Sequence, residues 1–210
     1  SNEDHRHQRR LRRMMRLIVI TDTPFIAGEG GIIRQLLDEG VDRVHLRKPG
    51  AAPDQMRRLI ESLPAAYHPR LSLQNCQQLA LEYGIGGVHL NARSPQPPLG
   101  FEGIVSRSCH SLEEPATHPE EDYLFLSPIF DSISKSGYRA AFTPEQLREG
   151  SRQGIINRRI VALGGIRPEH LPTLRDYGFG GAALLGCIWR DTSTEGLRQT
   201  LQAIRKFNDR

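Results

Sequence analysis

The strongest constraint on the fold is the regular return of short apolar runs along the chain. Eight runs are typical of buried strands: 17–22, 43–48, 70–74, 87–91, 104–109, 123–130, 159–165 and 181–189. Segments of helical period separate them, with predicted helices over 29–39, 53–63, 143–150, 168–177 and 193–207 and a short one between the third and fourth strands. Strands that alternate with helices predict a parallel sheet.

Eight such units in about 190 residues predict an α/β protein with a single (β/α)8 TIM barrel. An open doubly wound sheet is the alternative, but no glycine-rich dinucleotide fingerprint follows the first strand. Two crossovers are expected to be shortened. The one after the fourth strand contains three prolines in 94–100, and the one after the fifth, 112–121, allows only a short helix.

The first 16 residues carry the whole charge excess of the chain. They hold six Arg against one Glu and one Asp, and the remainder has 22 basic and 22 acidic residues. We therefore expect a basic tail over 1–16, disordered or left from cloning, and a barrel domain over 17–210. An RNA-binding arm is the alternative for the tail, although we do not favour nucleic acid as a partner.

Apolar content and cysteine usage suggest the compartment. No apolar run approaches the roughly 20 residues of a membrane helix, and 1–16 lacks the apolar segment of a secretory signal. The three cysteines, Cys76, Cys109 and Cys187, show no C-x-x-C spacing. Such a sparse, odd set favours a reduced compartment, so we expect a cytoplasmic protein without a membrane partner.

Function in a TIM barrel lies at the carboxyl ends of the strands. Here these ends are rich in cations, amides and hydroxyls and poor in carboxylates, which favours an anionic small molecule over a divalent metal. Glycines follow the seventh and eighth strands: Gly164 and Gly165, then Gly186 before Cys187. Backbone amides in these two loops are predicted to bind phosphate, the alternative being that the glycines only make tight turns.

Three further segments contribute candidate side chains. The loop 127–137 carries Ser132, Ser134 and Lys135 and could close over a substrate, or be only a solvated loop. His110 follows the fifth strand and could move a proton, or merely cap the next short helix. His45 and Arg47 lie two residues apart in the second strand and share a face, with Arg47 as the anion binder and Lys48 pointing outward.

Six motifs in this order resemble the thiamine phosphate synthase and TenI superfamily of phosphate-binding TIM barrels. They are HLR at 45–47, GVHL at 87–90, SRSCHSLEE at 106–114, the segment 123–137, ALGGI at 162–166 and GAALLGCI at 181–188. The resemblance covers roughly 17–190. It implies an enzyme of thiamine biosynthesis with a small phosphorylated thiazole as substrate. A homodimer is possible, but the sequence does not decide it.

The resemblance also shows where this chain departs from the synthase pattern. The family motif Q-x-R-x-K reads His45, Arg47 and Pro49 here. The family's N-D-D reads Gln74, Asn75 and Cys76, and Ser94 stands at the second metal aspartate. Lys135 and the glycine loops are retained. The magnesium and pyrophosphate half of the site is thus absent, so we predict no metal ligands.

The TenI branch implies a reaction that needs no metal, the tautomerisation of a thiazole carboxylate phosphate, with a histidine at the position of His110. We therefore expect a metal-independent thiazole tautomerase without a cofactor. His110 would carry the proton, Arg47 and Lys135 would meet negative charge, and Gln74 and Asn75 would orient the ring. Two alternatives stay open: a divergent, Mg²⁺-dependent thiamine phosphate synthase, and a non-catalytic regulator that binds thiazole or thiamine phosphate.

Overall fold

The chain folds into one closed parallel barrel in the computed structural model, which describes residues 1–132 and 139–209. The strands are β1 (Arg16–Ile20), β2 (Arg43–Leu46), β3 (Leu71–Leu73), β4 (Gly87–Leu90), β5 (Ile104–Cys109), β6 (Tyr123–Leu126), β7 (Ile160–Leu163) and β8 (Gly181–Leu184). Each strand pairs with the next, and β8 pairs with β1, where Val19 lies opposite Leu184. The predicted (β/α)8 barrel is therefore confirmed, because an open sheet would leave β1 and β8 unpaired.

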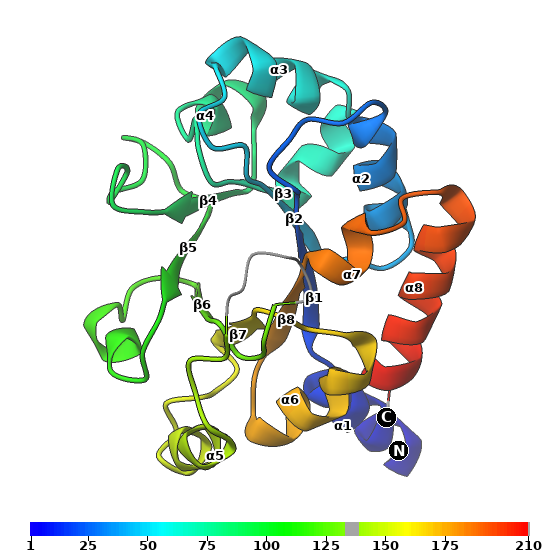
Figure 1. The fold of residues 1–210 in the computed structure, drawn as a ribbon, viewed down its shortest axis with the longest axis vertical. Helices are drawn as coiled ribbons and strands as arrows, with labels where there is room; N and C mark the ends of the chain where they lie inside the picture. Colours follow the sequence, from blue (N-terminus) through cyan, green and yellow to red (C-terminus); the bar gives the residue numbers. More distant parts are fainter. Residues whose placement is uncertain (133–138, 210) are drawn as a thin grey trace.

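Helices cover the outside of the barrel unevenly. They are α1 (Asn2–Arg13), α2 (Glu29–Asp38), α3 (Pro53–Glu61), α4 (Leu79–Tyr83), α5 (Pro144–Arg152), α6 (Leu171–Tyr177), α7 (Gly186–Trp189) and α8 (Thr194–Asn208), with 3-10 turns η1 (Ala65–Arg70), η2 (Glu114–Thr117) and η3 (Pro168–His170). Figure 1 shows α2, α6, α7 and α8 on one side of the strands. The opposite side, by β4 and β5, is mostly loop.

The two shortened crossovers lie on this loop-covered side. The residues between β4 and β5 form turns and no helix, and η2 is the only helical turn between β5 and β6. The prediction of shortened connections after the fourth and fifth strands is confirmed. The prolines of 94–100 prevent a helix because each removes a backbone donor and clashes with the preceding turn.

Most strands are shorter than the apolar runs that predicted them, and β6 and β8 differ the most. The run 181–189 was expected to be strand throughout, but β8 ends at Leu184 and the next residues form α7. The amides of Ile188 and Trp189 donate to the Leu185 carbonyl at 3.0 and 3.1 Å, which closes a helical turn. The run 123–130 likewise contains strand only as far as Leu126. Apolar runs do not mark strand ends, because a buried helix can be equally apolar.

The core has two parts, one on each face of the barrel wall. The larger lies between strands and helices and includes Leu36, Val44 and Leu184. The smaller lies in the barrel lumen and contains Ile18, Ile20, Tyr123, Phe125, Val161 and Ala183. Buried polar side chains, His45, Ser72, His89 and Ser106, also come from the barrel strands. The lumen is therefore apolar on the β6–β1 side and polar on the β2–β5 side.

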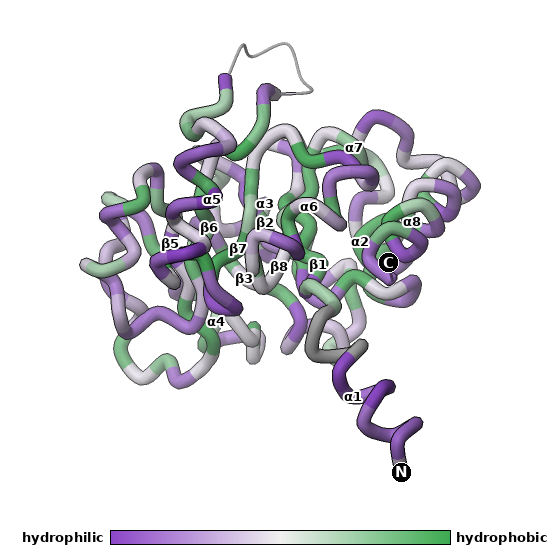
Figure 2. Tube along the Cα trace, turned by 90° about the horizontal axis from the view of Figure 1, so that it is seen from below, coloured by the Kyte–Doolittle hydropathy of each residue, from purple (hydrophilic) through white to green (hydrophobic). Residues whose placement is uncertain are grey.

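The amino-terminal segment, expected to be a disordered or cloning-derived tail, is helical over most of its length. Residues 2–13 form α1, a hydrophilic helix that projects from the barrel in Figure 2. Directly after α1, the chain is held to the end of α8. There the Asn208 side chain accepts from the Met15 amide and donates to the Met15 carbonyl. Among the described residues, no helix is long and apolar enough to cross a membrane.

Candidate active site

Two adjoining cavities open at the carboxyl ends of the strands. The first, here called the inner cavity, has a volume of about 500 Å³ and is bounded by β6, β7 and the loops that follow them. The second, the side cavity, has about 730 Å³ and lies toward β3, β4 and β5. Arg47, Gln74, Ser108 and His110 line both. Three of these residues, Arg47, Gln74 and His110, are candidate site residues predicted from the sequence.

His110 has one ring nitrogen held by the protein. Its Nδ1 lies 3.2 Å from the carbonyl oxygen of Ser127 and 3.3 Å from the Ser127 hydroxyl. A carbonyl only accepts, so the bond to it requires hydrogen on Nδ1 and leaves a lone pair on Nε2. Nε2 has no partner within the described part of the chain. The arrangement lets the exposed imidazole accept a proton from a ligand.

Arg47 lies at the rim of both cavities, and its backbone is held by two hydrogen bonds. Its amide donates to the Thr21 hydroxyl oxygen at 2.8 Å, and that hydroxyl donates to the Arg47 carbonyl at 3.2 Å. No carboxylate among the described residues pairs with the exposed guanidinium. Arg47 is therefore available to an anion that enters either cavity. Thr21 was missed, because nothing local in the sequence marks a contact between residues 26 positions apart.

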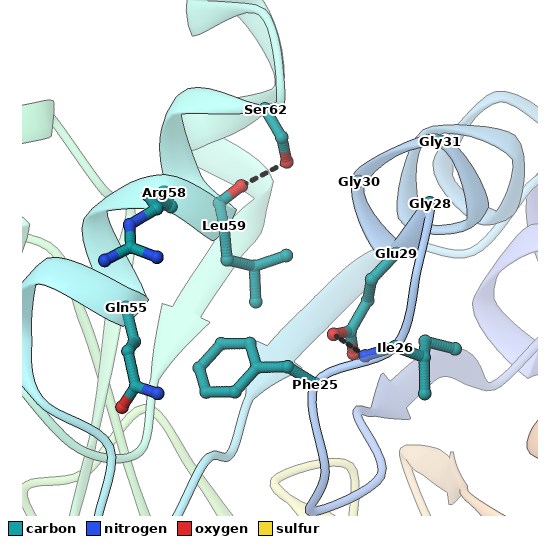
Figure 3. A pocket seen from close by; sticks show the side chains of 10 residues that line it. All are labelled: Phe25, Ile26, Gly28, Glu29, Gly30, Gly31, Gln55, Arg58, Leu59 and Ser62. Carbon is teal, nitrogen blue, oxygen red and sulfur yellow. Dashed lines mark hydrogen bonds between the residues drawn. The ribbon is translucent and has the colours of Figure 1, made fainter.

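Lys48 points away from the lumen, as expected, but it is fully buried. Its Nζ donates to Glu29 at 2.6 Å and to the carbonyls of Asp22 and Pro24 at 2.8 and 2.7 Å. Glu29 also accepts from the Ile26 amide, a bond drawn in Figure 3. The pair fastens the loop between β1 and α2 to the end of β2. Sequence reasoning missed Glu29, since its partner follows a different strand.

The loop held by this pair borders a third cavity, outside the barrel. It has about 380 Å³ and lies between the start of α2 and helix α3. Figure 3 shows the Phe25 ring pointing into it, opposite Gln55 and Arg58 of α3. It shares no lining residue with the other two cavities.

The Asn75 side chain is hydrogen-bonded to the backbone of Lys48. Its Oδ1 accepts from the Lys48 amide and its Nδ2 donates to the Lys48 carbonyl, both at 2.8 Å. Although Asn75 lines the side cavity, both ends of its amide are engaged. The structure therefore does not support the prediction that Asn75 orients the substrate ring.

Gln74 and His45 occupy different depths. Gln74 lines both cavities, and its Nε2 lies 2.9 Å from His45 Nδ1. His45 is completely buried and lines neither cavity. Although His45 shares a strand face with Arg47, its ring faces the protein, because its Nε2 is also engaged, 2.5 Å from the Tyr123 hydroxyl.

The glycine loops border the inner cavity only in part. Gly164, Gly165 and Ser132 line it, whereas the loop after β8 contributes Leu185 and not Gly186 or Cys187. Burial raises the pKa of the Cys187 thiol to about 11. Within the described residues, the amides of Gly165 and Gly186 donate to no carbonyl. These amides are available to an anion. Ser134 and Lys135 lie outside the described residues.

Glycine at 164 and 165 also has a packing reason. Both residues have positive φ, 108° and 63°. A Cβ on Gly165 would lie 2.1 Å from the Asp131 carbonyl oxygen, and one on Gly164 would lie 2.8 Å from Pro128 Cα. The two glycines therefore let the loop after β6 approach the loop after β7. Glycine can serve both purposes at these positions. The close packing of the loops requires the absence of a Cβ atom, whereas phosphate binding would require only the backbone amide.

The donor atoms near Asn75 do not fit a magnesium ion. Mg²⁺ prefers carboxylate oxygens, whereas the positions of the two metal aspartates in the synthase pattern hold Asn75 and Ser94 here. Both amide atoms of Asn75 are used by Lys48, and the Ser94 amide and carbonyl bond to Asn91. In residues 1–132 and 139–209, no three His, Cys, Asp or Glu side chains are grouped as a metal site would need.

Comparison with known proteins gives a consistent result. A family model described as thiamine monophosphate synthase matches residues 17–188. Thiamine-phosphate synthase of Geobacillus kaustophilus is 28% identical over 193 residues, which cover 85% of this chain and 86% of the relative. That of Syntrophomonas wolfei is 28% identical and covers 91% and 97%.

Solved structures agree with the sequence relatives. A thiamine phosphate pyrophosphorylase from Bacteroides thetaiotaomicron is 37% identical, with a TM-score of 0.82 over 93% of this chain and 98% of that one. One from Pyrococcus furiosus, 23% identical with a TM-score of 0.73, shares the fold.

Proposed function

Because the chain belongs to the thiamine monophosphate synthase and TenI family, we propose that it is a metal-independent thiazole tautomerase of thiamine biosynthesis. Its substrate is a thiazole carboxylate phosphate, which it converts to the aromatic isomer. The proposal rests on the different bonding of two residues, His110 and Asn75. His110 presents an available Nε2 at the cavities, whereas Asn75, where the synthase pattern has a metal aspartate, spends its amide on the backbone of Lys48.

The proposed reaction moves one proton from one carbon of the substrate to another. His110 Nε2 removes the proton from the ring carbon that carries the carboxylate, and the electron pair shifts through the ring. The same nitrogen then returns the proton to the carbon outside the ring, which leaves the aromatic isomer. The Nδ1 bond to Ser127 stays intact throughout and keeps the imidazole oriented.

The remaining groups would hold the substrate at its two ends. Arg47 pairs with the carboxylate or with the negative charge that develops when the proton leaves. The amide of Gly165 receives the phosphate in the cavity, and that of Gly186, next to the lining residue Leu185, is the second proposed donor. Lys135 keeps its proposed role as a second cation. No step passes through a metal, since the side chains near Asn75 do not fit one.

The first test is aromatisation of the non-aromatic thiazole carboxylate phosphate in the presence of EDTA, followed by ultraviolet absorbance. We expect turnover without pyrimidine diphosphate, and a loss of about 10²- to 10⁴-fold in His110→Ala, the usual contribution of general acid–base catalysis. His7→Ala, an exposed histidine of α1, is the matched control and should retain full activity. No acceleration over buffer would refute the tautomerase.

The names of the relatives favour a second candidate, a divergent thiamine-phosphate synthase. It predicts release of pyrophosphate when pyrimidine diphosphate, thiazole phosphate and Mg²⁺ are added together, and loss of that activity with EDTA. Binding of thiamine phosphate or thiazole phosphate with neither turnover would identify the non-catalytic regulator. The two assays and one binding measurement separate the three functions.

A further inference from the structure

The third cavity, between the start of α2 and helix α3, has no part in the proposed reaction. It shares no lining residue with the inner cavity or the side cavity. Its volume of about 380 Å³ falls within the range of small-molecule pockets, roughly 300–1,000 Å³. Such pockets combine an apolar wall with a few polar groups that orient a ligand, and this cavity has both.

The apolar wall is built around an exposed aromatic ring. Phe25 is 39% exposed, and its ring points into the cavity in Figure 3. Lys48 Nζ lies 4.9 Å from the centroid of this ring and also bonds the carbonyl of Pro24, so the ring and the loop that carries it are held in place. Ile26 and Leu59 extend the wall. A fixed ring face of this kind favours a planar apolar ligand.

Glycine leaves part of the α2 wall without a side chain. Gly30 is required for packing, because a Cβ there would lie 2.1 Å from the Ser62 hydroxyl oxygen. Gly31 lines the cavity within the helix, and a Cβ added to it would meet no atom within 4 Å. Glycine inside a helix is destabilising relative to alanine, and packing gives no reason for it at this position. What Gly31 does is keep the space beside it open.

The cationic group of the cavity is Arg58. Its neighbour in α3, Arg57, pairs with Asp54 at 2.9 Å and with Glu82 at 3.3 Å. Arg58, by contrast, pairs with no carboxylate in the part of the chain that the structure describes. Figure 3 shows its guanidinium and the Gln55 amide on the α3 side of the cavity. The charge of Arg58 is therefore available to an anionic ligand.

The other polar groups in the lining do not cancel this charge. Glu29 is the one carboxylate among the described lining residues, and both of its oxygens are engaged. Oε2 accepts from Lys48 Nζ at 2.6 Å and Oε1 from the Ile26 amide at 3.3 Å. The Oε1 of Gln55 accepts from the Ala52 amide, which leaves Nε2 of Gln55 as a second donor. The cavity thus offers donors to an anion and an apolar face to the rest of a ligand.

We propose that the third cavity is a binding site for a small aromatic anion, a planar ring system with one anionic group, whose rings stack on Phe25 and whose charge pairs with Arg58. The site is separate from the proposed active site and does not depend on the proposed reaction. A second copy of the chain is a poorer occupant. A specific protein interface buries roughly 1,200–2,000 Å², whereas a cavity of about 380 Å³ receives only a small group.

The first test compares two fluorescent probes that differ only in charge. They are 8-anilinonaphthalene-1-sulfonate and N-phenyl-1-naphthylamine, which has the same rings without the sulfonate. In titrations of the full-length chain, Arg58→Gln should weaken sulfonate binding about tenfold or more, the effect of a lost bond to a charged group, and leave binding of the neutral amine unchanged. Arg57→Gln is the matched control, since it removes the same charge from the same helix outside the cavity.

The second test changes the shape of the cavity. Phe25→Ala should weaken binding of both probes, because it removes the ring face. Gly31→Leu should also weaken both, because leucine fills the open space. Its melting temperature should not fall below that of the unmodified protein, since leucine favours a helix more than glycine does. A lost affinity in this variant then reports the cavity and not unfolding.

Two results would overturn the proposal. Equal sulfonate affinities in Arg58→Gln and Arg57→Gln would show that no anion pairs with Arg58, and full affinity in Gly31→Leu would show that the probe binds elsewhere. Gel filtration tests the other occupant. A dimer that dissociates in Gly31→Leu, in a chain that does not bind the sulfonate, would assign the cavity to a second copy and refute the small-molecule site.

Discussion

Asn75 shows how one amide can replace a carboxylate for structural reasons. It accepts from the Lys48 amide and donates to the Lys48 carbonyl. An aspartate could make the first bond but would place a second acceptor against the carbonyl. We therefore expect Asn75→Asp to lower the free energy of unfolding by about 1–3 kcal/mol, measured by urea denaturation, without creating a Mg²⁺ dependence.

Asn157→Asp is the control for this substitution. Asn157 also donates from Nδ2 to a backbone carbonyl, that of Gly154, but it is exposed at a turn. Water can replace its bond, so the expected loss is below about 0.5 kcal/mol. Equal losses of unfolding free energy in the two variants would show that the two bonds from Asn75 to the Lys48 backbone contribute no more than an exposed bond. Activity of Asn75→Asp that Mg²⁺ stimulates would instead favour a metal site at this position.

Single residues also show what sequence alone could predict of the site. His110 and Arg47 could be named as candidates because each directly follows a barrel strand, and both line the cavity at these strand ends. The structure gives His45 and Asn75 protein partners instead of a place at a ligand, and sequence could not show this because these partners lie 27 to 78 positions away. Ser134 and Lys135 remain predictions.

At the scale of elements, the order of strands was predictable and their ends were not. The alternation of apolar runs with helical segments specified the barrel, and the prolines of 94–100 specified a missing helix. The ends of β6 and β8 were misplaced because the buried segments that follow them are as apolar as the strands. Composition marks burial, whereas a strand end depends on where backbone bonding to the neighbour stops.

The contact between the loops after β6 and β7 can be tested at Gly165. Alanine there would combine a positive φ of 63° with a Cβ 2.1 Å from the Asp131 carbonyl oxygen. Gly154 has a φ of 75° but open space around its Cβ position, so Gly154→Ala isolates the conformational cost. We expect a loss of about 1–2 kcal/mol for Gly154→Ala and about 1–3 kcal/mol more for Gly165→Ala.

Urea unfolding of the two glycine variants measures this difference, and the activity assay adds a second readout. Gly165→Ala should also raise KM, since the displaced loop moves the amide that is proposed to receive phosphate, whereas Gly154→Ala should leave KM unchanged. Equal stability in the two variants would mean that the loop after β6 yields at little cost, and that the close approach of the two loops is not a constraint on the site.

At the scale of the whole molecule, the polar half of the lumen makes barrel stability depend on pH. Burial, with the charges of Arg107 and Arg47, lowers the pKa of His89 to about 3 from an ordinary 6.5, and burial lowers that of His45 as well. Below about pH 6.5 the unfolded chain binds protons at these rings and the folded chain does not. Acid therefore favours unfolding, and stability falls as the pH drops from about 6.5 toward 3.

Each of these rings adds a slope of up to about 1.4 kcal/mol per pH unit within that window. Urea unfolding between about pH 4.5 and 6.5 should show this slope, and His89→Gln, which cannot be protonated, should reduce it by up to that amount. His7→Gln, exposed on α1, should leave it unchanged. An unaltered slope in His89→Gln would mean that the folded barrel accepts a proton at His89, and that its lumen is wetter than the bonds of His89 to Ser106 and Ser108 imply.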